Sequence, residues 1–83
     1  MKIKITITNY SNERMLIIKE PEAVNGFIET NDEIEVETNE QEDNIVIRIG
    51  KDDDGIIYVQ IWDALNTKCV IYHEGKDMFK EYL

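Results

Sequence analysis

The amino-acid sequence predicts an all-β protein, a small β-sandwich or barrel of about seven short, mainly antiparallel strands with a short C-terminal helical turn. Three observations lead to this prediction. β-Branched residues gather in short runs that alternate with polar residues, turn-forming residues separate these runs roughly every 8–12 residues, and no long segment shows a helical repeat. The 83 residues suffice for one core, so residues 1–83 are expected to form a single β domain.

The first two predicted strands differ in how they present their apolar residues. Lys2–Thr8 has isoleucine at every second position from Ile3, which predicts a strand with one wet face. Turn formers fill Asn9–Glu13. Arg14–Lys19 is apolar on both faces, which indicates cover on both sides or a central place in a sheet. Glu20-Pro21 ends this strand, because proline has no amide hydrogen to donate.

The middle of the chain combines turn signals with a second alternating pattern. Asn25-Gly26 tolerates positive φ and therefore predicts a tight turn, which a short strand over Phe27–Thr30 follows. Asn31-Asp32 predicts another turn. Glu33–Thr38 alternates strictly, which predicts a strand with its apolar residues toward the core and its glutamates toward water.

The second half of the chain continues the same pattern of strands and turns. Ile45–Ile49 alternates, and Asp52–Gly55 has the composition of a hairpin tip. Ile56–Trp62 predicts the next strand and Lys68–His73 the last one, with a turn between them. Apolar residues recur at helical spacing within Met78–Leu83, which predicts the short helical turn.

The chain is strongly acidic, with 18 acidic residues, 9 basic residues and a formal net charge of −9. This charge opposes binding to nucleic-acid phosphates and docking on anionic membranes. It suits a basic protein partner, or simply high solubility. We therefore expect a protein partner and neither a nucleic-acid nor a membrane partner.

Cysteine content and hydropathy bear on the compartment. The one cysteine cannot form an intramolecular disulfide. The N-terminal segment lacks the continuous apolar run of a signal peptide, and no stretch approaches the roughly 20 apolar residues of a transmembrane helix. These observations predict a cytoplasmic protein.

The charge is densest between Glu20 and Asp43, where ten carboxylates occur without any lysine or arginine. Alternate carboxylates of one strand lie about 6.5–7 Å apart on one face, which suits mimicry of DNA phosphates toward a basic groove. Two other interpretations are a solvated face that protects an edge strand from aggregation and neutralisation by Lys2 and Lys4 of a neighbouring strand. The candidate partner-binding residues are Glu33, Glu35, Glu37, Glu40, Glu42 and Asp43.

Three aromatic residues form a second candidate surface. Tyr58 and Trp62 share one face of a predicted strand, and Tyr72 is expected beside them on the next strand. Such a patch suits recognition of a protein, a small ligand or a carbohydrate, since tryptophan and tyrosine are common interface anchors. The alternative is a second layer of core that Phe79 and Tyr82 cover.

The sequence shows no catalytic constellation. Cys69 and His73 point to the same face of a strand, but four strand residues hold them about 13 Å apart, too far for a nucleophile and its base. Asp52–Gly55 lacks the ligand offsets of an EF-hand loop, and zinc-ligand spacing and phosphate-binding glycine loops are absent. We expect a protein that is not an enzyme and uses neither a metal nor a cofactor.

A longer pattern runs through the first half of the chain, as Asn12-Glu13-x-x-Leu16-x-Ile18-x-Glu20-Pro21, Phe27-Ile28 and Asn31-Asp32-Glu33-Ile34-Glu35-Val36. It resembles a group of small uncharacterised bacterial proteins, in which a strand ending in Glu-Pro precedes an aromatic-apolar strand and a Pro-Gly-Glu turn. Where those proteins have Trp or Gly after Glu-Pro, this chain has Glu22-Ala23, and where they have Pro-Gly it has Asn31-Asp32. The resemblance implies a compact β domain with no established activity and brings no catalytic residue.

These features favour a non-enzymatic protein-interaction module, an immunity-type or inhibitory binding protein whose acidic face caps a basic surface. Two alternatives stay open. One is a small-ligand or carbohydrate binder that uses the aromatic patch, and the other is a structural protein that forms a homodimer.

Overall fold

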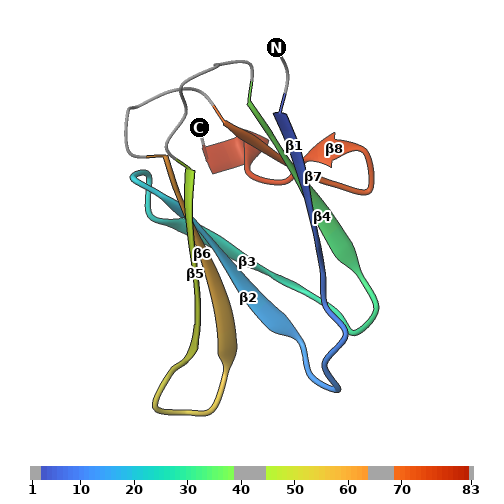
Figure 1. The fold of residues 1–83 in the computed structure, drawn as a ribbon, viewed down its shortest axis with the longest axis vertical. Coiled ribbons are helices and arrows are strands. Elements are labelled where there is room, and N and C mark those ends of the chain that lie inside the picture. The colour runs from blue at the N-terminus through green and yellow to red at the C-terminus, as the bar shows by residue number, and fades with distance from the viewer. Residues whose placement is uncertain (1–2, 39–44, 64–68, 83) are drawn as a thin grey trace.

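The computed structural model describes residues 3–38, 45–63 and 69–82. They form eight strands in two sheets that are not closed into a barrel (Figure 1), so the prediction of an all-β protein is confirmed. The sequence predicted about seven strands, and the structure adds a very short one near the C-terminus. The elements are β1 (Ile3–Thr8), β2 (Met15–Glu20), β3 (Val24–Ile28), β4 (Glu33–Thr38), β5 (Ile45–Lys51), β6 (Ile57–Asp63), β7 (Val70–His73), β8 (Lys76–Asp77) and a single 3-10 turn (Lys80–Tyr82).

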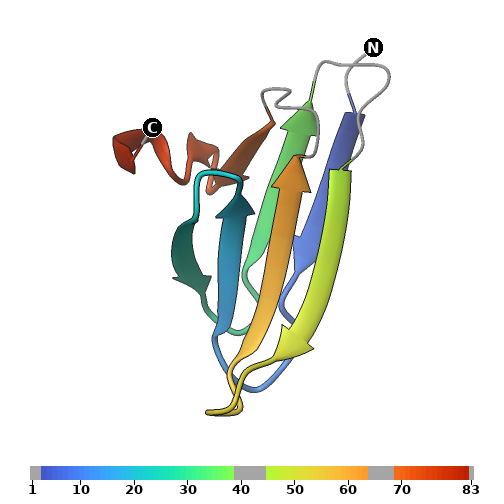
Figure 2. The same ribbon diagram turned by 90° about the vertical axis from the view of Figure 1, so that its left-hand side faces the viewer.

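The first sheet has the strand order β1-β4-β7-β8, and the second sheet has the order β3-β2-β6-β5. The long strands follow the long axis of the molecule (Figure 2). Among the described pairs, β2 and β6 are parallel and the others are antiparallel. β2 lies between β3 and β6. This confirms the predicted central place in a sheet, which was one of two interpretations of its apolar residues.

The core lies between the two sheets and is made of every second residue of the strands. Side chains of a strand alternate between its faces, so each strand turns one row toward the other sheet. Burying a valine or isoleucine side chain contributes about 1.5–3 kcal/mol to stability. The inward-facing rows of the strands are therefore the main source of stability. Among the described residues, the buried apolar ones are Met15, Ile17, Ile28, Ile34, Val36, Val59, Ile61, Cys69, Ile71 and Phe79.

The connection between β2 and β3 differs from the prediction. The turn lies at Pro21–Ala23, where Glu20-Pro21 is a cis peptide bond and Ala23 has a φ of 60°. Asn25-Gly26, predicted to be the turn, lies inside β3. Gly26 is closely packed there, because a Cβ atom at this position would lie 3.0 Å from the Cε atom of Met78, and this flexible side chain would have to shift slightly.

The core-facing row of β2 ends in a lysine. Lys19 is only 4% exposed and forms an ion pair with Glu22 of the following turn. An ammonium group removed from water needs such a charged partner. The turn at Pro21–Ala23 therefore brings β3 alongside β2 and also supplies the counter-charge of Lys19.

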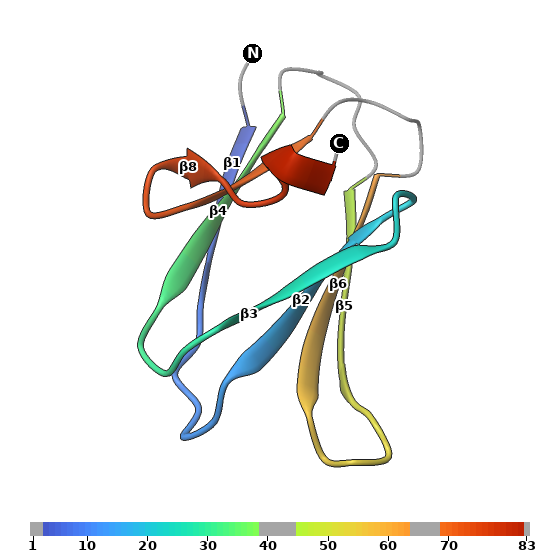
Figure 3. The same cartoon turned by 180° about the vertical axis from the view of Figure 1, so that it is seen from behind.

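The C-terminal segment contacts both sheets, β7 of the first through its backbone and Gly26 of β3 in the second through Met78 and Phe79. The Met78 amide donates to the carbonyl of Ile71 at 2.8 Å, and Phe79 is buried in the core. This segment lies at the end of the molecule where β1 begins and β4 ends (Figure 3). Within the described ranges, no helix is long and apolar enough to cross a membrane.

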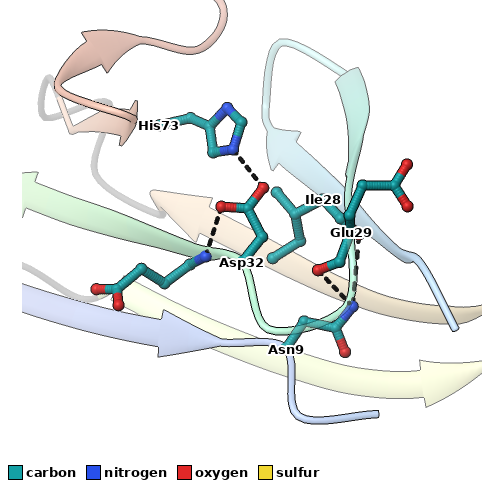
Figure 4. A network of polar contacts seen from close by, with 6 residues as sticks. Asn9, Ile28, Glu29, Asp32 and His73 are labelled. Carbon is teal, nitrogen blue, oxygen red and sulfur yellow. Dashed lines mark hydrogen bonds and ion pairs between the residues drawn. The ribbon is translucent and has the colours of Figure 1, made fainter. Parts of the chain in front are cut away.

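The Asn9 side chain, which is completely buried, joins two turns at the opposite end of β1. Its amide nitrogen lies 2.8 Å from the carbonyl oxygen of Glu13. It also lies 3.4 Å from the carbonyl oxygen of Ile28 and 3.2 Å from that of Glu29 (Figure 4). Its carbonyl oxygen accepts from the amide and the hydroxyl of Ser11. A single side chain thus ties the β1–β2 turn to the end of β3.

The backbone of the same residue holds the β3–β4 turn. The Asn9 amide donates to the carbonyl of Asp32 at 2.8 Å, and the Asn31 amide donates to the carbonyl of Asn9 at 2.7 Å. Asn31 has a φ of 66°, a left-handed conformation that asparagine tolerates better than most residues. The predicted Asn31-Asp32 turn is confirmed, and Asp32 is placed directly before β4.

We expect Asn9→Ala to lower the free energy of unfolding by about 2–4 kcal/mol, because it leaves several buried backbone groups without a hydrogen-bond partner. Urea denaturation followed by tryptophan fluorescence measures this loss. Asn12→Ala is the matched control, since Asn12 is exposed in the same turn. Equal losses in the two variants would contradict the role given to the Asn9 side chain.

Candidate functional site

The predicted carboxylate row lies on the outer face of the first sheet. Glu33, Glu35 and Glu37 alternate along β4 with the buried residues Ile34 and Val36. β4 is an interior strand between β1 and β7, so the interpretation that the row protects a sheet edge is wrong. The other predicted members of the row, Glu40, Glu42 and Asp43, lie outside the described residues.

β1 compensates part of the charge of this row. The Nζ atom of Lys4 lies 3.7 Å from the Oε1 atom of Glu35, with 58% and 38% of the two side chains exposed. An ion pair this exposed contributes roughly 0–1 kcal/mol. Neutralisation by the neighbouring strand is therefore confirmed for Lys4 and Glu35, while Lys2 lies outside the described residues.

On the other side of the row, β7 and the β7–β8 turn border a shallow hollow of about 370 Å³. Tyr72 stands opposite Glu35 in the register of β4 and β7. An aromatic face among carboxylates is a suitable environment for a lysine or arginine side chain. The described lining residues include four carboxylates and no basic side chain, and they are Glu33, Ile34, Glu35, Glu37, Tyr72, Glu74 and Gly75.

The predicted aromatic patch is divided between the two sheets. Tyr58 and Trp62 lie on β6 in the second sheet, whereas Tyr72 lies on β7 in the first. The expectation that the three rings lie side by side is wrong, because strands consecutive in the sequence here belong to different sheets. Tyr58 also packs across Gly50 of β5, since a Cβ atom at Gly50 would lie 2.7 Å from the tyrosine oxygen.

The outer face of the second sheet carries apolar side chains from all four strands, with a polar row of Asn25, Gln60 and Arg48 across its middle. Leu16 of β2 stands between Phe27 of β3 and Tyr58 of β6, and Val46 of β5 stands opposite Trp62. Phe79 is buried between the sheets and does not cover this face, which corrects the alternative of a second core layer. Tyr82 ends the last turn.

Sequence reasoning missed the contact between Asp32 and His73. The Nε2 atom of His73 lies 2.5 Å from the Oδ2 atom of Asp32, and both side chains are about one quarter exposed. The other oxygen of Asp32 accepts from the Glu33 amide at 2.9 Å. Figure 4 shows the imidazole ring directed at the carboxylate, which links the β3–β4 turn to the end of β7.

The hydrogen bond from His73 lowers the pKa of Asp32 below its ordinary value of 3.8, although partial burial acts in the opposite direction. The amide of Glu33 adds to the lowering. Asp32 is thus ionised in the folded protein near neutral pH, and the Nε2 hydrogen of His73 is the donor of their bond.

The predicted hairpin tip at Asp52–Gly55 is confirmed. The Gly55 amide donates to the carbonyl of Asp52 at 3.0 Å, and Gly55 has the positive φ that this position requires. The Oδ1 atom of Asp52 accepts from the amides of Asp54 and Ile56. The first aspartate of the run therefore closes the turn, and the next two are exposed.

Comparisons with family models, with curated proteins and with solved structures found no significant match for this chain.

We expect Asp32→Asn to reduce stability more at pH 6 than at pH 3. A lowered pKa means that the ionised carboxylate stabilises the folded state above its ordinary pKa, and that this contribution is lost as the pH falls through the lowered value. Urea midpoints of wild type and variant at the two pH values measure the difference. Asp53→Asn at the exposed hairpin tip is the control, and an equal effect at both pH values for Asp32→Asn would contradict the prediction.

Proposed function

We propose that the protein is a non-enzymatic interaction module of the inhibitory or immunity type, which uses the outer face of its first sheet to bind a basic protein surface. The single observation that supports this function best is the hollow that Tyr72 lines together with four carboxylates. A lysine or arginine of the partner would place its cation over the tyrosine ring and its hydrogen bonds on the flanking carboxylates.

The rigidity of the face also favours binding. Glu33, Glu35 and Glu37 stand on an interior strand with paired neighbours on both sides, so their backbone is ordered before a partner arrives. Preorganisation of this kind reduces the entropy lost on association. The negative charge of the whole chain, −9, would speed the encounter with a basic partner and make the rate depend on salt.

An oligo-arginine peptide is a defined probe for this face. We expect NMR titration of the labelled protein to show shifts centred on β4 and Tyr72, with a dissociation constant that rises steeply with salt. Replacing Glu33, Glu35 and Glu37 together by lysine should weaken binding at least about tenfold, given roughly 0.2–1 kcal/mol for each exposed ion pair and the added repulsion.

The matched control replaces Asp53, Asp54 and Glu81, three exposed acids of other surfaces, by lysine. Both triple variants move the formal net charge from −9 to −3, so they differ only in where the charge changes. If the control variant retains more peptide binding than the β4 variant, the result supports the outer face of the first sheet as the binding site. An equal loss in the two variants would show attraction to net charge alone and would contradict the proposal.

The apolar side chains on the outer face of the second sheet support a second candidate function, assembly of a homodimer. Phe27 and Val46 are 39% and 36% exposed there, Val46 stands opposite Trp62, and exposed apolar groups of this kind commonly form interfaces. Val46→Lys should then shift the mass measured by light scattering from dimer to monomer. A wild-type monomer at every concentration would eliminate this candidate.

A further inference from the structure

Within the described part of the chain, Asp32, His73 and Glu74 bring three potential metal ligands together. One donor atom of each lies within 4.8 Å of the donor atoms of the other two. Asp32 comes from the β3–β4 turn, while His73 and Glu74 come from the end of β7, so sequence spacing does not reveal the group. We propose that these three residues bind a divalent transition-metal ion of the zinc class.

Two of the three donor atoms are already close to the spacing that a metal requires. Tetrahedral Zn²⁺ with ligand bonds of 2.0–2.1 Å holds its ligand atoms about 3.3 Å apart. The Nε2 atom of His73 and the Oδ2 atom of Asp32 are 2.5 Å apart, so they need to separate by less than an ångström. The ion takes the place of the Nε2 hydrogen of His73, and in the neutral imidazole that hydrogen moves to Nδ1, which leaves Nε2 free to bind the ion.

The surroundings orient the carboxylate for this task. The second oxygen of Asp32 is held by the Glu33 amide at 2.9 Å, and the carbonyl of Asp32 is held by the Asn9 amide at 2.8 Å. Hydrogen bonds that fix a ligating group from behind are a regular feature of metal sites. Asp32 and His73 keep about one quarter of their side chains exposed, which leaves a path for an ion and room for a water ligand.

The third ligand stands on a strained backbone position. Glu74 has a φ of 54°, in the left-handed region that costs a non-glycine residue about 1–2 kcal/mol. Gly75 follows at a φ of 78°, so the turn places glutamate where glycine would be favoured by conformation alone. A carboxylate that completes a metal site accounts for glutamate at this position.

The chemistry of the donors selects the class of ion. One imidazole and two carboxylates suit Zn²⁺, Co²⁺ or Mn²⁺, whereas Ca²⁺ and Mg²⁺ prefer oxygen ligands alone and Cu⁺ prefers sulfur. The single cysteine, Cys69, is buried and does not belong to the group. Three protein ligands leave at least one position of the ion for water.

Titration of the tag-free, chelator-treated protein with ZnCl₂ tests the proposal. Calorimetry should show one equivalent bound, and NMR should show a shift of the imidazole of His73, the only histidine. His73→Gln should abolish binding, and Asp32→Asn and Glu74→Gln should each weaken it at least about tenfold. Glu81→Gln and Cys69→Ser are the controls and should bind as the wild type does.

Glu74→Gly separates the ligand role from the conformation of the turn and cannot fail by unfolding the core, because Glu74 is exposed. It should raise the Tm of the metal-free protein, since glycine adopts positive φ without strain, and it should remove the rise in Tm that Zn²⁺ produces in the wild type. The proposal would be overturned if calorimetry showed no heat of Zn²⁺ binding and NMR showed no shift of the His73 imidazole. Undiminished Zn²⁺ binding by His73→Gln would overturn it as well.

Discussion

The buried amide of Asn9 is the constraint on which the candidate sites depend. An amide without access to water must satisfy its donors and its acceptor inside the protein, because each unsatisfied group costs about 1–3 kcal/mol. Asn9 does so with carbonyls of the β1–β2 turn and of the end of β3, and its own backbone bonds to Asn31 and Asp32. One residue thus fixes where β4 begins and so which of its side chains turn outward.

The start of β4 decides the chemistry of both of its faces. With Asp32 in the turn, Ile34 and Val36 enter the core while Glu33, Glu35 and Glu37 form the outer row. A shift of one residue would exchange the two rows, burying carboxylates and exposing isoleucine. The antiparallel register then sets Ile34 opposite His73, which brings the imidazole within reach of Asp32 just before the strand.

The alternation of apolar residues was sufficient to predict all-β structure, the bounds of β4 and the placement of glutamates on one face, because these properties are local. The side-by-side placement of Tyr72 with Tyr58 and Trp62 failed because it required the sheet to which each strand belongs. The contact of Asp32 with His73 was missed for the same reason, since it joins residues 41 positions apart. Gly26 shows a different limit: a glycine after asparagine suggested a turn, whereas this glycine lies inside β3 and packs closely against Met78.

Glu74 connects the two proposed sites, because it lines the hollow around Tyr72 and also belongs to the group with Asp32 and His73. A carboxylate that ligates a divalent ion no longer offers its full charge to a lysine or arginine, and the ion adds positive charge beside the hollow. Occupancy of the proposed metal site would therefore work against a basic partner at the near end of the acidic face. Because linkage is reciprocal, a partner bound over Tyr72 would weaken metal binding by the same factor. The strained turn after β7 is thus where the two proposed sites would be coupled, because Glu74 belongs to both.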